Sequence, residues 1–228
     1  MPDIATTTAI HKPLVAIVGP SGSGKSTSLR NLDPATTVIL DGEQKGFPFV
    51  GAKNFTVKTF ANNAQYNEAM KWALEQPKTE LVVVESFTKV AFQIKTVCVQ
   101  AFKGFDIWSS YSRMVRNTLN ASKNTKAIVV FTAIDEIVEI LQPDGSSVSK
   151  RMIGAEGKEL AKQGGIEPDM LVVLFTDVRK NAQGKVEYRF ETNNDGVTTA
   201  KTPMGLFDER FIPNDFKLVV DAVKAKLL

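Results

Sequence analysis

The sequence predicts an α/β domain with a mostly parallel central sheet, flanking helices and an antiparallel hairpin near the C-terminus. Short apolar runs typical of buried strands alternate with segments of helical periodicity over residues 13–132. Residues 186–190 then alternate between apolar and polar after a turn at residues 181–184, which is typical of a hairpin. The 228 residues suffice for one domain with a substantial core, so we expect a tail over residues 1–12 and a single domain over residues 13–228.

Five apolar runs are the predicted strands of the sheet. They are residues 13–18, 36–40, 81–84, 127–132 and 170–176. Runs this apolar are typical of strands that are covered on both faces, as they are in a parallel sheet. A further strand is expected after the turn at residues 194–196, ending near Lys201.

Four segments are predicted to be helical. They are residues 25–32, 63–75, 105–122 and a C-terminal segment that Asn214 can cap. The second of them carries its apolar residues at helical spacing and is closed by Pro77. In contrast, residues 142–169 are rich in glycine, serine and lysine and show little periodicity, so we expect a long loop there.

Charge is distributed unevenly along the chain. The net charge of +3 is too small to indicate a partner, but residues 86–130 contain seven basic residues against one acid, Asp106. A solvated helical surface and a surface that faces a polyanion account equally well for this excess.

The cysteine and hydropathy patterns fit a protein of a reducing compartment. The single Cys98 cannot form an internal disulfide, and the single His11 makes neither a metal site nor a catalytic triad. The first twelve residues have no apolar signal core, and no apolar run approaches the ~20 residues that span a membrane. We therefore expect a cytoplasmic protein with no membrane partner.

A glycine-rich loop follows the first predicted strand. Its sequence, GPSGSGKST, fits the pattern G-x-x-x-x-G-K-S/T and lies between an apolar strand and a helix, as that motif requires. The glycines let successive backbone N–H groups point at phosphate oxygens, and Lys25 reaches the terminal phosphates. We therefore predict that ATP is bound by Gly19, Pro20, Ser21, Gly22, Ser23, Gly24, Lys25, Ser26 and Thr27.

Three acidic residues follow two of the other strands. P-loop proteins hold Mg²⁺ with the hydroxyl of the loop and with an acidic residue at the end of a neighbouring strand, which here are Ser26 and Glu85. Asp41 and Glu43, in VILDGEQKG, are both candidates for the carboxylate that orients an attacking water. The sequence thus predicts a magnesium-dependent ATPase.

Together these residues resemble the RecA-like ATPase core: a nucleotide loop, then Asp-x-Glu after the next strand, then an apolar run ending in Glu-Ser. The resemblance implies that Glu43 is the catalytic base, beside Lys25 on the phosphates. In VVFTAIDE, Thr132 and Asp135 are available as the polar sensor of that family, but Ile134 replaces its usual glutamine or histidine.

A basic finger is the fourth feature of such proteins. Oligomeric RecA-like ATPases insert it into the neighbouring subunit's ATP, often as Lys-x-Arg after an antiparallel strand. In TTAKTPMG, Lys201 matches the lysine, while Pro203 stands in the place of the arginine. The resemblance therefore makes Lys201 a candidate third catalytic residue, with a plain surface lysine as the alternative.

The resemblance covers residues 13–203. Among RecA-like proteins, the chain is most similar to the compact single-strand annealing proteins of bacteriophages, which are AAA family ATPases. It implies rings or filaments that anneal or pair single-stranded DNA during phage recombination, in the host cytoplasm. The implied partners are single-stranded DNA, further copies of this chain and a single-stranded DNA-binding protein. DNA contacts are expected in the loop at 142–169 and in part of residues 86–130. The candidate residues are Lys150, Arg151, Lys158 and Lys162.

Two other classes of P-loop protein remain open. A small-molecule kinase would transfer the terminal phosphate to a metabolite, and an ATPase of the packaging or helicase-loader type would act on protein or duplex DNA. An ABC transporter ATPase is disfavoured, because LAKQGG at residues 160–165 does not supply its LSGGQ-type signature.

Overall fold

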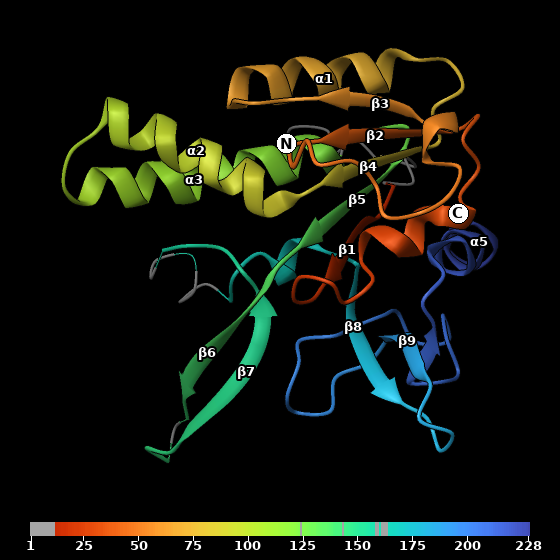
Figure 1. Cartoon of the computed structure of the whole chain (residues 1–228). Coiled ribbons are helices and arrows are strands. Elements are labelled where there is room, and N and C mark those ends of the chain that lie inside the picture. The colour runs from red at the N-terminus through yellow and green to blue at the C-terminus, as the bar shows by residue number, and fades with distance from the viewer. Residues whose placement is uncertain (1–11, 124, 143, 158–159, 161–163) are drawn as a thin grey trace, which may run out of the picture.

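The computed structural model describes residues 12–123, 125–142, 144–157, 160 and 164–228. Its largest element is an eight-stranded sheet in the order β10-β9-β8-β1-β5-β4-β2-β3. The six strands from β8 to β3 in that order run parallel, and β9 and β10 extend the sheet in antiparallel fashion (Figure 1). The predicted fold class is therefore confirmed.

The strands of this sheet have the following bounds: β1 Leu14–Val18, β2 Thr37–Asp41, β3 Thr56–Thr59, β4 Leu81–Glu85, β5 Ile128–Ala133, β8 Val172–Lys180, β9 Val186–Glu191 and β10 Phe211–Pro213. All residues of β1, β2, β4 and β5 are buried, as their apolar sequences predict. The five predicted strands and the hairpin strand β9 are all present. β3 and β10, short strands at the two edges of the sheet, were not predicted.

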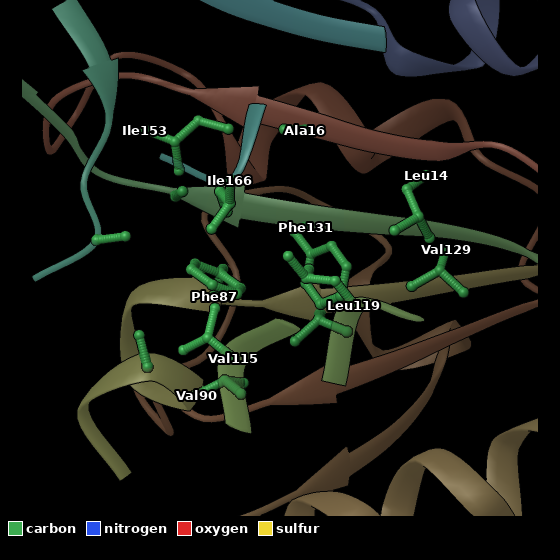
Figure 2. Packing of buried hydrophobic residues seen from close by; sticks show 14 of the residues in the cluster. Leu14, Ala16, Phe87, Val90, Val115, Leu119, Val129, Phe131, Ile153 and Ile166 are labelled. Atoms are coloured by element: carbon green, nitrogen blue, oxygen red, sulfur yellow. The ribbon is translucent and has the colours of Figure 1, made fainter. Parts of the chain in front are cut away.

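Two layers of helices cover the sheet. The α-helices are α1 Asn63–Glu75, α2 Phe87–Ala101, α3 Phe105–Lys123 and α5 Phe216–Leu227. One face packs against α1, α2 and α3, and the other against α5 and the short helix that follows the glycine-rich loop. Figure 2 shows the first of these cores, where Phe131 of β5 lies among Phe87 of α2 and Leu119 of α3. The rings of Phe87 and Phe131 meet edge to face, 5.6 Å apart.

Three expectations need correction. The helix predicted at residues 25–32 is a 3-10 helix, η1, over Ser26–Asn31. The cap of α5 is Asp215, whose side chain accepts from the N–H of Lys217, and not Asn214. The segment after the turn at 194–196 forms isolated bridges, including Lys201 with Val173, and no regular strand.

The largest correction concerns the loop expected at residues 142–169. Part of it is a strand, β7 Ser147–Ile153, which pairs antiparallel with β6 Asp135–Leu141. This ribbon projects away from the eight-stranded sheet (Figure 1). Of the residues expected to contact DNA, Lys158 and Lys162 lie outside the described residues. Among the helices that are described, none is long and apolar enough to cross a membrane.

Candidate active site

The predicted nucleotide-binding loop, the predicted metal ligands and Glu43 meet at the carboxyl ends of the parallel strands. Because parallel strands end on the same side, the loop after β1 and the carboxyl ends of β2 and β4 face each other. They enclose a cavity of about 790 Å³. Its walls are Ser21, Gly22, Gly24, Lys25, Ser26, Thr27, Glu43, Lys45, Gly46, Phe47, Pro48, Glu85, Ser86 and Ile134.

The glycine-rich loop is held close to the sheet, which explains its composition. A Cβ atom on Gly19 would lie 1.8 Å from Oγ1 of Thr176 on β8, so no larger residue fits there. The same hydroxyl lies 2.6 Å from Oγ of Ser23, which fastens the middle of the loop to β8. Gly24 has a φ of 94°, a conformation that glycine adopts without strain.

Lys25 lies across the mouth of this loop. Its ammonium donates to the carbonyl oxygens of Gly19, at 2.7 Å, and of Pro20, at 2.8 Å. Burial lowers the pKa of Lys25, and the negative charges of Glu85 and Asp135 offset part of that effect. The cation is thus placed beside the backbone N–H groups that would hold a phosphate chain.

Ser26 and Glu85 form the predicted metal-binding pair. The Ser26 hydroxyl donates to Oε1 of Glu85 at 2.7 Å, and burial raises the pKa of Glu85. The other oxygen of that carboxylate, Oε2, is buried and makes no hydrogen bond of regular geometry among the described residues, although the Thr132 hydroxyl is close enough to lower the pKa of Glu85. A buried carboxylate oxygen in that position is costly, and a divalent cation or its bound water would satisfy it. The residues therefore fit Mg²⁺.

Asp41 and Glu43 have different surroundings, although they are only two residues apart. Oδ1 of Asp41 accepts the backbone N–H groups of Glu43 and Gln44, at 2.9 Å each, and so shapes the turn after β2. Glu43 instead lines the cavity, where its Oε1 accepts from the Ser86 hydroxyl at 2.9 Å. Of the two candidates, only Glu43 is presented to a ligand in the cavity.

The candidates for a polar sensor do not line the cavity. Thr132 is fully buried in β5, with its hydroxyl 3.5 Å from the Val84 carbonyl oxygen. Asp135 pairs with Arg151 at the base of the β6–β7 ribbon. Ile134 does line the cavity, so an apolar side chain occupies the position of the sensor.

Lys201 is not among the residues that line the cavity of its own chain. Its backbone pairs with Val173 at the start of β8, and the acids that act on its charge are Glu167 and Asp169. Burial lowers the pKa of Lys201, and these two carboxylates oppose the effect. Contact between Lys201 and a nucleotide would therefore involve the site of another chain.

The two described DNA candidates lie side by side on β7 but differ in their contacts. Nε of Arg151 lies 2.8 Å from Oδ2 of Asp135, and its guanidinium stands 5.5 Å from the centre of the Phe175 ring. Arg151 therefore stabilises the root of the ribbon. Lys150 lies farther out, opposite Val138 of β6.

Several cavity residues had no role predicted from the sequence, among them Lys45, Phe47 and Ser86. Nζ of Lys45 lies 3.6 Å from Oε2 of Glu43, on the side of that carboxylate opposite to Ser86. The spacing of Glu43 and Lys45, two residues apart in the turn after β2, is the one signal by which Lys45 could have been found.

A phosphate-binding loop on a central parallel strand, next to a hydroxyl–carboxylate pair and a second carboxylate, is the construction of a P-loop nucleotide-binding protein. That is the class of this protein. A profile of the AAA domain matches residues 11–204, and the chain belongs to this ATPase family. No curated protein matches the sequence.

Proposed function

We propose that this protein is a RecA-like ATPase that requires Mg²⁺, assembles into rings or filaments, and anneals or pairs single-stranded DNA in phage recombination. The observation that supports hydrolysis best is the position of Glu43. Its carboxylate lines the same cavity as the phosphate-binding loop and is oriented by Ser86, the residue that follows the metal ligand Glu85.

Each residue of the site has a defined task in this proposal. The loop N–H groups and Lys25 bind the phosphate chain, and Ser26 and Glu85 hold Mg²⁺. The metal ion, when bound, neutralises negative charge on the phosphate oxygens. Glu43 accepts a hydrogen bond from the attacking water and so orients it toward the terminal phosphate.

The proposal for single-stranded DNA is supported by the surface of the α2–α3 pair, within the basic region at residues 86–130. Phe105, at the turn between these helices, is 92% exposed, and Phe92 of α2 and Trp108 of α3 are exposed as well. Lys89 and Lys103 are exposed on the same two-helix unit. Aromatic rings that can stack on bases and cations that can bind phosphates, on one surface, are the combination by which proteins bind single strands.

The proposed oligomer rests on the position of Lys201, which is away from its own cavity and would act on a neighbour's site. A single-stranded DNA-binding protein remains a proposed partner, because an annealing protein needs access to strands that such proteins cover.

The test combines an ATPase assay with a DNA-binding titration. We expect hydrolysis that depends on Mg²⁺ and increases with single-stranded DNA, and binding that tolerates any sequence and weakens steeply with salt. Lys25→Ala should lose tight ATP binding and keep the fold. Absence of DNA binding at low salt, together with phosphate transfer to a metabolite, would instead favour a small-molecule kinase.

A further inference from the structure

We propose that Lys45 is a second phosphate-binding cation of this site and contacts the terminal phosphate of the nucleotide bound to its own chain. The inference rests on the proposed ATPase function and assigns a role to a residue outside the phosphate-binding loop. Lys45 belongs to the part of the cavity lining that the segment after β2 forms.

The backbone of this segment is anchored so that Glu43 and Lys45 face the same way. Asp41 accepts the N–H groups of residues 43 and 44, at 2.9 Å each. The side chain of Gln44, whose φ is 53°, turns away and donates to the carbonyl oxygen of Phe60 at 3.0 Å. Glu43 and Lys45, on either side of Gln44, both line the cavity.

Contacts place the Lys45 charge beside the carboxylates that follow β2 and β4. Lys45 lies next to Oε2 of Glu43, whose Oε1 accepts from Ser86, the residue that follows Glu85. Glu43 is the acid within ion-pair distance of Lys45, and that contact is loose, at 3.6 Å. The Lys45 side chain is 63% exposed, so it can turn from Glu43 to a phosphate at little cost.

A cation at the position of Lys45 would assist phosphoryl transfer. Negative charge on the transferring phosphate is stabilised by fixed cations around it, and many ATPases receive one of these from a neighbouring subunit. Here Lys25 follows β1 and Lys45 follows β2, with β5 and β4 between those strands, and both side chains line the cavity. A lysine supplied by the same chain would let each subunit assemble most of its own site.

The experiment compares affinities for ATP and ADP in the hydrolysis-deficient Glu43→Gln background. Adding Lys45→Ala should weaken ATP binding at least about fivefold and leave ADP binding unchanged, since the lost contact is with the terminal phosphate. Lys45→Arg should retain most of the affinity. Lys53→Ala, an exposed lysine that does not line the cavity, is the matched control.

In the otherwise wild-type protein, Lys45→Ala should lower kcat by about 10-fold or more, given the effects of removing one fixed donor. Unchanged ATP affinity in the Glu43→Gln background would overturn the inference and leave Lys45 as a partner of Glu43 alone. Equal losses of ATP and ADP affinity would also overturn it. Failure of the wild-type protein to bind ATP at all would instead contradict the proposed function.

Discussion

At the scale of single residues, the two carboxylates after β2 show how surroundings assign different tasks to similar groups. Asp41 is buried and its Oδ1 is already engaged by two backbone N–H groups. Glu43 is partly exposed to the cavity and oriented through Ser86 Oγ. A carboxylate that must polarise water has to be reachable by that water, and only Glu43 satisfies this condition.

We therefore predict that Glu43→Gln retains ATP binding and loses hydrolysis by about 10²–10⁴-fold, because an amide keeps the shape but cannot accept a proton. Asp41→Asn is the matched comparison. It should lower stability by on the order of 1 kcal/mol through weaker hydrogen bonds to the turn, with hydrolysis largely kept. Normal turnover by Glu43→Gln together with an inactive, folded Asp41→Asn would show that Asp41 is the base.

At the scale of elements, the β6–β7 ribbon is attached to the body through a buried carboxylate. Oε1 of Glu167 accepts from the N–H of Ile153, at the end of β7, and from the hydroxyl of Thr199. Burial raises the pKa of Glu167, an effect that these hydrogen bonds only partly offset. The folded protein therefore binds this proton more tightly than the unfolded chain does.

It follows that the contribution of Glu167 to stability is complete below the ordinary pKa of glutamate and is lost as the pH rises through the folded-state value. Glu167→Gln should reduce that loss, since the amide stays neutral and can still accept from Ile153. Urea unfolding between about pH 5 and pH 8 measures the effect. Exposed Glu209→Gln is the control, and an identical pH dependence in both variants would contradict this prediction.

The elements that sequence patterns missed have clear physical reasons. In β6, apolar residues occupy both faces, with Ile137 and Leu141 on one and Val138 and Ile140 on the other, so no period of two appears. β3 is mostly exposed and forms because β2 offers it free hydrogen-bonding groups. The sequence of β3 itself therefore carries no pattern typical of a buried strand. Strands with continuous apolar sequences, such as β1 and β4, were predictable because burial on both faces requires that composition.

The residues of the site also divide into those that sequence patterns predict and those that they miss. The phosphate-binding loop is a contiguous motif whose spacing encodes its geometry, and Glu85 follows from its place at a strand end. The contact between Ser86 and Glu43 spans 43 residues and depends on β2 lying next to β4, which a linear pattern cannot show. The same applies to Thr176, whose hydroxyl meets the loop from β8.

At the scale of the whole molecule, the question is whether one chain completes its own site. Lys201 is the candidate for a residue shared between subunits, and we predict that it acts on the neighbour's nucleotide. Lys201→Ala and Glu43→Gln subunits, each inactive alone, should regain partial activity when mixed. Some interfaces in the mixture then combine an intact base with an intact Lys201.

The same mixture made with Lys45→Ala in place of Lys201→Ala provides the control. Lys45 and Glu43 belong to the cavity of one chain, so no interface between those variants can restore both, and no rescue is expected. Full activity of Lys201→Ala by itself, or no rescue in oligomers shown to be mixed, would exclude a shared role for Lys201.

The segment between β2 and β3 has a consequence beyond catalysis. Phe47, Phe49 and Phe55 contact one another in sequence, the first pair tilted and the second edge to face, with ring centres 5.9 Å apart. They pack on the same face of the sheet as α5. Phe47 is also a wall of the cavity. One short stretch of chain is thus both a cover for the core and a surface for the ligand. Local opening of this stretch would expose the core and disrupt the cavity at the same time. A bound ligand should therefore slow the hydrogen exchange of the amide protons in this stretch.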